Sequence, residues 1–187
     1  MAELTFVYST MSAGKSLDLL KNAHQYSERG NKVLYFTTVK DKQRGKGVIS
    51  TRLGITTQAN LTEECDLFAL AEKELPCMIY VDEAQFLSAG QVIELTRIVD
   101  RLNIPVTAYG LKTDFQGNLF PGSMALIQYA DNLVELSVPC WYCSNKATMN
   151  MRVDNDDKPV FSGKQVQIGD NYLPVCRKCY FEKKSAK

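Results

Sequence analysis

Near its N-terminus the sequence reads Leu4-Thr5-Phe6-Val7-Tyr8-Ser9-Thr10-Met11-Ser12-Ala13-Gly14-Lys15-Ser16. An apolar run of β-forming residues, Leu4–Tyr8, leads here into a loop that ends in Gly-Lys-Ser. From Ser16 to about Arg29 apolar residues recur at helical spacing, and Gly30-Asn31 is typical of a helix end. Lys32–Thr38 then predicts a second strand. The chain therefore begins with a strand–loop–helix–strand unit, the crossover of a parallel α/β sheet.

The following residues continue this alternation of helices and strands. Helices are predicted at Leu61–Lys73 and Ala89–Leu102, because their apolar residues recur at helical spacing. The basic, aperiodic segment Lys40–Gly54 is expected to be a mobile surface loop. Strands are predicted at Cys77–Val81, Pro105–Tyr109 and Leu133–Val138.

Composition limits the class of protein. With 187 residues, 45% hydrophobic and 23% charged, the chain suits one α/β domain with a small appendage. A net charge of +1 gives no general reason to expect a nucleic-acid or membrane partner. The N-terminus lacks a basic region and a cleavage site, and no apolar stretch approaches the ~18 residues that span a bilayer. We therefore expect a cytoplasmic protein.

The loop after the first strand has the pattern of a phosphate-binding loop. It ends in the Gly14-Lys15-Ser16 of the motif G-x-x-x-x-G-K-[ST], with Ser9 in place of the first glycine. In this chemistry backbone N–H groups turn toward phosphate oxygens, Lys15 bridges the β- and γ-phosphates, and the Ser16 hydroxyl binds Mg²⁺. A chance Gly-Lys-Ser in a turn is the alternative. The strand before the loop and the helix after it favour a nucleotide site.

Two acidic residues, Asp82 and Glu83, directly follow the predicted strand Cys77–Val81. They therefore lie at the carboxyl end of this strand, which is where ligands of open α/β sheets bind. Asp82 is suited to hold Mg²⁺, and Glu83 to accept a proton from an acceptor hydroxyl or from water. A solvated acidic turn is the alternative. This pair of motifs does not by itself distinguish a kinase from an ATPase. The only histidine, His24, lies within a predicted helix and is expected at the surface.

Four of the six cysteines form two Cys-x-x-Cys pairs, Cys140/Cys143 and Cys176/Cys179. Four thiolates arranged in two such pairs are typical of a closed, structural Zn²⁺ site, and residues 144–175 then form a long insert between them. Free thiols or a redox pair are the alternative. A zinc ribbon that binds nucleic acid, attached to a P-loop ATPase, is the rival function.

Composition changes at Pro139, so we place a domain boundary near residue 138. The predicted fold class is α/β, with a P-loop parallel-sheet core in residues 1–138. A small zinc-ribbon or lasso domain, acting as a lid, is expected in residues 139–187.

Two further segments complete a family resemblance that runs from about residue 4 to residue 182. Asp82-Glu83-Ala84-Gln85-Phe86 is similar to the catalytic signature of type II thymidine kinases, a small zinc-containing family found in many bacteria. Residues 109–120, from Tyr109-Gly110-Leu111-Lys112-Thr113-Asp114-Phe115 to Phe120, resemble the nucleoside-pocket loop of that family. The phosphate loop resembles that of its bacterial members, in which serine can also replace the first glycine.

This resemblance implies an ATP-dependent thymidine kinase, with Glu83 as the general base on the 5′-hydroxyl of thymidine. It also implies Mg²⁺ at Ser16 and Asp82, structural Zn²⁺ and a homotetramer, and no nucleic-acid or membrane partner. The implied cofactor-binding residues are Ser9, Thr10, Met11, Ser12, Ala13, Gly14, Lys15, Ser16, Asp82, Glu83, Ala84 and Gln85. The implied nucleoside-binding residues are Met11, Phe86, Leu111, Phe115, Phe120, Gln165, Val166, Gln167, Ile168, Gly169 and Tyr172.

Core packing is the alternative for the three phenylalanines, and simple packing is the alternative for Tyr172. The sequence departs from the family pattern at two positions. In Asp41-Lys42-Gln43-Arg44 the arginine stands one position late, and Asn150 stands where the family usually has a small or apolar residue near the thymine methyl group.

Overall fold

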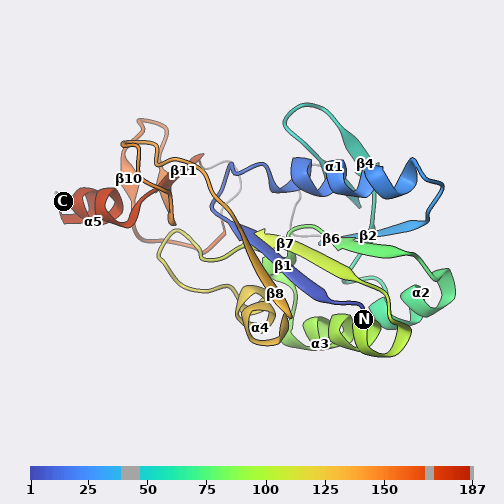
Figure 1. The fold of residues 1–187 in the computed structure, drawn as a ribbon. Coiled ribbons are helices and arrows are strands. Elements are labelled where there is room, and N and C mark those ends of the chain that lie inside the picture. Colours follow the sequence, from blue (N-terminus) through green and yellow to red (C-terminus); the bar gives the residue numbers. More distant parts are fainter. Residues whose placement is uncertain (39–46, 167–170, 186–187) are drawn as a thin grey trace.

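The computed structural model describes residues 1–38, 47–166 and 171–185 (Figure 1). Its central feature is a sheet of strands in the order β5-β2-β6-β7-β1-β8, in which every pairing is parallel. The predicted parallel α/β core is therefore confirmed. The strands are β1 (Leu4–Ser9), β2 (Val33–Thr37), β5 (Asn60–Leu61), β6 (Met78–Val81), β7 (Val106–Leu111) and β8 (Asn132–Leu136).

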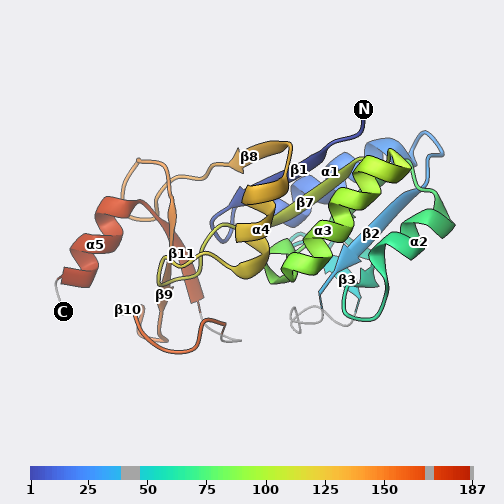
Figure 2. The same ribbon diagram turned by 90° about the horizontal axis from the view of Figure 1, so that it is seen from below.

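Helices cover both faces of this sheet. Helix α1 (Lys15–Ser27) lies on one face, and α2 (Leu67–Glu74), α3 (Ala89–Arg97) and α4 (Pro121–Tyr129) lie on the other (Figures 1 and 2). Two short helices complete the core, a 3₁₀-helix at Ala84–Phe86 and a π-helical turn at Ile98–Leu102 that continues α3. This arrangement buries the sheet on both sides, which is the usual requirement of parallel strands.

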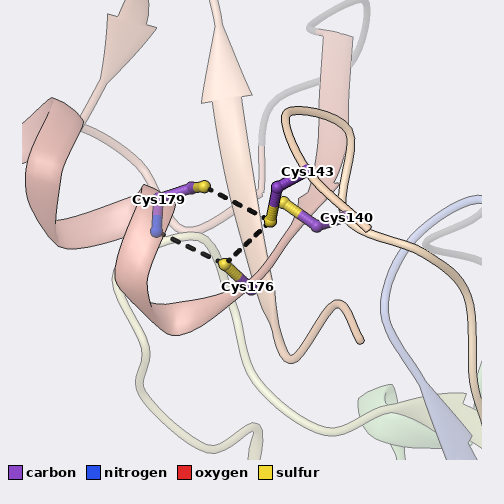
Figure 3. A group of neighbouring side chains, drawn as sticks. All are labelled: Cys140, Cys143, Cys176 and Cys179. Atoms are coloured by element: carbon purple, nitrogen blue, oxygen red, sulfur yellow. Dashed lines mark hydrogen bonds between the residues drawn. The ribbon is translucent and has the colours of Figure 1, made fainter. Parts of the chain in front are cut away.

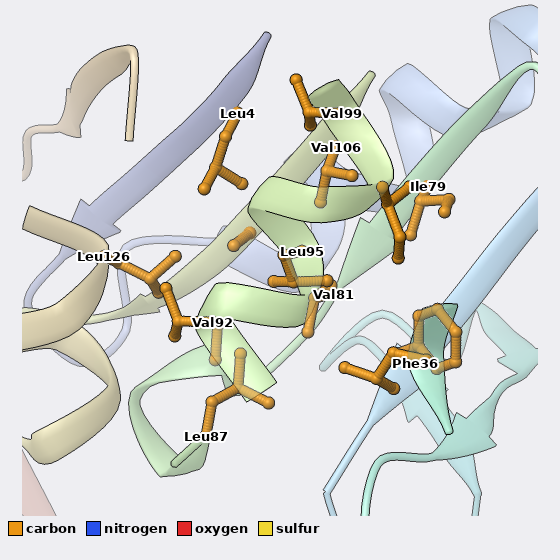
Figure 4. Packing of buried hydrophobic residues seen from close by; sticks show 14 of the residues in the cluster. Leu4, Phe36, Ile79, Val81, Leu87, Val92, Leu95, Val99, Val106 and Leu126 are labelled. Carbon is orange, nitrogen blue, oxygen red and sulfur yellow. The ribbon is translucent and has the colours of Figure 1, made fainter. Parts of the chain in front are cut away.

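The larger hydrophobic core lies between the sheet and helices α2, α3 and α4 (Figure 4). Val92 and Leu95 of α3 and Ile98 of the π-helical turn recur every three residues, and each is fully buried. They pack with strand residues such as Ile79 and Val106. The apolar residues that recur at helical spacing in the sequence therefore form the helix face that packs against the sheet.

Two predicted boundaries were wrong. The helix predicted at Leu61–Lys73 begins only at Leu67, because Leu61 joins the sheet edge in β5 and Asp66 caps the helix N-terminus. Part of the predicted loop Lys40–Gly54 is instead a strand, β3 (Val48–Ser50), which pairs with β4 (Thr56–Gln58) in an antiparallel hairpin. Residues 39–46, including Arg44, lie outside the described residues.

The cap of α2 supports a stability prediction. The Asp66 carboxylate accepts a hydrogen bond from the backbone N–H of Ala69 at 2.8 Å. We expect Asp66→Ala to lower the free energy of unfolding by about 1 kcal/mol, because that N–H group loses its partner. Urea denaturation followed by circular dichroism would measure the loss. The exposed Glu72→Ala in the same helix is the control, and equal stability of the two variants would contradict the assignment of the cap.

A smaller unit lies beyond the end of the sheet toward which β1 and β7 point (Figure 1). Strand β9 (Met149–Val153) is the centre of an antiparallel sheet, flanked by β10 (Pro159–Val160) and β11 (Asn171–Val175). Helix α5 (Arg177–Ser185) follows β11. Met151, Val175 and Tyr180 form a separate hydrophobic cluster together with the cysteines.

Candidate active site

The loop between β1 and α1 has the backbone conformation that an anion site needs. Ser12 and Gly14 have φ angles of 62° and 76°, and both therefore lie in the left-handed region. Left-handed residues in such a loop turn successive N–H groups toward one side, and helix α1 begins directly behind them at Lys15. The loop therefore presents backbone donors and a helix N-terminus to the same point.

Lys15 is held inside this loop. Its side chain is buried, and its Nζ donates hydrogen bonds to Ser9 Oγ and to the Thr10 carbonyl oxygen, each at 3.2 Å. Ser9, which replaces the first glycine of the motif, therefore gives the lysine a partner within the loop. The hydroxyl of Thr10 is buried and has no hydrogen-bond partner. An orphaned donor beside Lys15 fits a loop built to receive phosphate oxygens.

Ser16 and Asp82 meet at the carboxyl end of β6. The Ser16 hydroxyl donates to Asp82 Oδ2 at 2.9 Å, and Asp82 is almost completely buried. Burial, together with the neighbouring charge of Glu83, raises the pKa of Asp82 to about 7. A hydroxyl and a carboxylate are oxygen ligands of the kind that Mg²⁺ prefers, so these residues fit the cation expected from the sequence.

Glu83 is held in place by Gln85. Its backbone is left-handed, with φ of 53°, and its carboxylate accepts a hydrogen bond from Gln85 Nε2 at 2.5 Å. The other end of the Gln85 amide accepts from the backbone N–H of Leu111 at 3.1 Å, and the side chain is buried. Gly110 is needed beside it, because a Cβ there would lie 3.0 Å from Gln85 Oε1. Gln85 therefore fixes the direction of the Glu83 carboxylate, a role that the sequence did not indicate.

One cavity of about 1070 Å³ joins the phosphate loop, Glu83 and a group of apolar side chains. Phe115 and Phe120 are buried, and the rings of Phe86 and Phe120 meet edge to face with centroids 5.6 Å apart. The volume suits a nucleoside together with a phosphate chain. Of the residues expected from the sequence, the cavity is lined by Met11, Ser12, Ala13, Gly14, Lys15, Ser16, Glu83, Gln85, Phe86, Leu111, Phe115, Phe120, Gln165, Val166 and Tyr172.

Four other expected residues do not line the cavity. Ser9, Thr10, Asp82 and Ala84 are buried behind its wall, where the first three support Lys15 and Ser16. The expected lid residues Gln167, Ile168 and Gly169 lie outside the described residues. His24 is exposed on α1, as expected.

The segment that borders the cavity on the side of the small unit is attached by two side chains. Gln165 Nε2 donates to Asp114 Oδ2 at 3.0 Å. Arg152 is buried, with its guanidinium 3.9 Å from the centre of the Phe115 ring, and it donates to the carbonyl oxygens of Ser162 and Lys164 at 2.9 Å each. A cation over an aromatic face is attractive. Sequence reasoning missed Arg152, because a single arginine in a strand carries no local signal of such a contact.

The four cysteines of the two Cys-x-x-Cys pairs form one cluster (Figure 3). Their sulfur atoms all lie within 4.8 Å of one another, and the Cys143–Cys176 and Cys179–Cys143 sulfur distances are both 3.7 Å. A disulfide would require about 2.05 Å. A tetrahedral zinc ion with Zn–S distances of about 2.3 Å places its sulfur ligands about 3.8 Å apart. The cluster therefore has the dimensions and the donor set of a structural zinc site.

The thiols of this cluster differ in acidity. Although burial opposes the change, hydrogen bonds from the backbone N–H groups of Cys176, Tyr142 and Cys143 lower the pKa of Cys140 to about 7. Hydrogen bonding to Cys176 raises the pKa of Cys179 to about 12. Backbone N–H groups aimed at sulfur stabilise thiolate, the form that binds metal.

The fold and the site define a P-loop nucleotide-binding protein with a four-cysteine zinc centre. Residues 2–180 match the family model described as "Thymidine kinase". The chain is 46% identical over 186 residues to a thymidine kinase of Streptococcus pyogenes serotype M3 (strain ATCC BAA-595 / MGAS315), covering 97% of this chain and 98% of that protein. It is 45% identical over 185 residues to one of Listeria monocytogenes serotype 4b (strain F2365), covering 96% and 97%. The chain belongs to the thymidine kinase family, in its type II bacterial branch.

One solved structure that matches part of this chain is titled "Replication initiator DnaA bound to AMPPCP and single-stranded DNA". It is 18% identical, with a TM-score of 0.43, and the match covers 73% of this chain and 40% of that chain. A likeness at this level carries no argument about function.

Proposed function

We propose that this protein is a thymidine kinase that transfers the γ-phosphoryl group of ATP to the 5′-hydroxyl of thymidine, giving ADP and thymidine monophosphate. One structural observation supports the proposal in addition to family membership. The phosphate loop, Glu83 and the aromatic pocket all line the same cavity, so a nucleoside and a triphosphate have room to meet beside one carboxylate.

In this mechanism the protein positions the reactants and balances charge. The backbone N–H groups of the loop and the Lys15 ammonium bind the phosphate oxygens. Glu83, aimed by Gln85, accepts the proton of the 5′-hydroxyl as that oxygen attacks. Ser16 and Asp82 would hold Mg²⁺, which would neutralise phosphate charge when bound. Phe86, Phe115, Phe120 and the lid exclude water, and this exclusion disfavours hydrolysis.

The lid is the part of the chain from residue 139 onward, and we propose it as a separate domain that closes over the nucleoside. Leu111, Gln165, Val166 and Tyr172 line the cavity on the nucleoside side, together with the phenylalanines. Gln167, Ile168 and Gly169 are proposed to complete this contact. A pocket that holds the base through backbone and buried polar groups is selective, because a wrong base leaves those groups without hydrogen-bond partners.

Several broader properties belong to the same proposal. We propose that the enzyme acts in the cytoplasm in a salvage step that supports DNA synthesis, and that it has no nucleic-acid partner. A homotetramer is proposed from the family resemblance, and the exposed Leu133 and Val134 on β8, one edge strand of the parallel sheet, offer apolar surface for a contact between subunits. No helix in the described part of the chain is long and apolar enough to cross a membrane.

Radiolabelled ATP assayed against a panel of nucleosides tests the proposal. We expect label on the 5′-oxygen of thymidine and little turnover of ATP without a nucleoside. Turnover of ATP in the absence of any nucleoside, stimulated by DNA in a salt-dependent way, would instead favour a P-loop ATPase with a nucleic-acid-binding zinc ribbon.

A further inference from the structure

Asn150 connects three parts of the molecule. It is the second residue of β9, the central strand of the small sheet, and it is 2% exposed. Its Oδ1 accepts a hydrogen bond from the backbone N–H of Met11 at 2.7 Å, and its Nδ2 donates to the carbonyl oxygen of Thr113 at 2.8 Å. One buried amide thus bonds the phosphate loop at one end and the segment after β7 at the other.

Several other contacts of the small unit reach the segment after β7. Tyr180 Oη donates to the Phe115 carbonyl oxygen at 2.7 Å, Arg152 stacks on the Phe115 ring, and Gln165 bonds Asp114. Asn150 extends this connection to Met11. Met11 directly precedes Ser12, whose left-handed backbone shapes the phosphate-binding loop. A shift of β9 would therefore be transmitted to the N–H groups that face the phosphates.

Both ends of the amide match their partners in chemistry. An asparagine side chain offers one acceptor and a pair of donors, and here a backbone N–H meets the acceptor while a backbone carbonyl meets a donor. A small or apolar residue at this position can offer no such pair. Because the amide is buried, removing it leaves a backbone N–H and a backbone carbonyl without this partner.

We infer that Asn150 is a positioning residue that aligns the phosphate loop with the zinc-centred lid, so that ATP and thymidine bind cooperatively. The inference rests on the proposed function, since thymidine is taken as the ligand that the lid orders. Because Tyr172, Leu173 and Asn150 of the small unit line the cavity, a nucleoside bound there would hold β9 in place, and through Asn150 it would hold the loop in its phosphate-binding shape. Thymidine should then tighten the binding of the triphosphate, and by linkage ATP should tighten the binding of thymidine to the same degree.

Calorimetric titration with a non-hydrolysable ATP analogue, in the presence and absence of thymidine, measures this coupling directly. We expect thymidine to lower the Kd of the analogue by about fivefold or more in the wild type, the lower end of typical coupling. In Asn150→Leu, which keeps the branched shape of the side chain and removes both hydrogen bonds, the ratio should fall to about 1. The kcat should fall by about 10- to 100-fold, because a small misplacement of reactants is costly.

Asn150→Ala is the second variant, in case leucine is too bulky, and Met151→Leu is the matched control. Met151 is the next residue of β9, is fully buried, and belongs to the cluster around the cysteines. The Met151→Leu variant should keep both the coupling between the two ligands and the kcat. Zinc content and melting temperature, measured for every variant, separate positioning from folding.

A folded, zinc-replete Asn150 variant with wild-type coupling and kcat would overturn the inference, and so would a wild type without coupling. Loss of zinc in both Asn150 variants would make Asn150 a folding residue and would also overturn it. If the wild type binds both ligands but transfers no phosphoryl group to thymidine, the proposed function fails while the coupling can still be measured.

Discussion

Glu83→Gln is expected to lower the rate of thymidine phosphorylation by about 10²- to 10⁴-fold, the usual contribution of a general base. Glutamine keeps the size of the side chain and can still bond Gln85, so the pocket should be preserved while the proton acceptor is lost. Binding of ATP should remain near the wild-type level, because the phosphate loop is unchanged. The kcat from a radiolabel assay and the Kd of a non-hydrolysable ATP analogue together measure the effect.

Glu72→Gln is the control for this variant. Glu72 is an exposed carboxylate on α2, and its loss should leave the kcat within about twofold of the wild type, as expected for a surface substitution. If Glu83→Gln phosphorylated thymidine at the normal rate, Glu83 would not be the base. If it lost ATP binding as well, the carboxylate would serve the nucleotide rather than the acceptor.

Loss of zinc is expected to remove the function of the lid and to spare the sheet. In Cys176→Ser, or after chelation, kcat/KM for thymidine should fall by at least about 10²-fold, because structural zinc supplies much of the folding free energy of such small units. The separate cluster around Met151 and Tyr180 includes all four cysteines, so it is built around the metal site. Hydrogen exchange should show lost protection in β9 and β11 and retained protection in β1, β6 and β7.

Cys77→Ser is the matched control for the zinc variant, because Cys77 lies outside the cluster and is only half-buried. It should keep one zinc ion per chain and normal activity. If Cys176→Ser kept full activity with thymidine, zinc would not order the nucleoside lid. If β1 and β7 lost protection together with β9, the two units would fold as one.

The core and the chemical motifs were predictable because their signals are local. The strand before Ser9, the Gly14-Lys15-Ser16 loop and the two Cys-x-x-Cys pairs are each short stretches whose chemistry depends on spacing alone. Helix α4 was missed for a physical reason. It starts with Pro121-Gly122, a pair typical of turns, but Gly122 is required there because a Cβ would lie 2.4 Å from the Ala84 carbonyl oxygen.

The supporting side chains of the site were not predictable, because their partners are distant in the sequence. Gln85 bonds Leu111, Arg152 stacks on Phe115, and Asn150 reaches Met11 from the other end of the chain. Each of these contacts depends on how elements distant in the sequence pack together. A single sequence shows the polar residue and does not show what it faces.

The hydroxyl of Ser9 has a consequence for how ATP is received. Since Lys15 already rests against this hydroxyl, most of its rotamer freedom was lost when the chain folded. Immobilising a free lysine side chain costs up to about 2 kcal/mol of conformational entropy. Because Lys15 is already ordered, this cost does not weaken the binding of the nucleotide. An incoming triphosphate meets an ammonium group that is already oriented, and it competes with the Ser9 hydroxyl and the Thr10 carbonyl for the protons of that group.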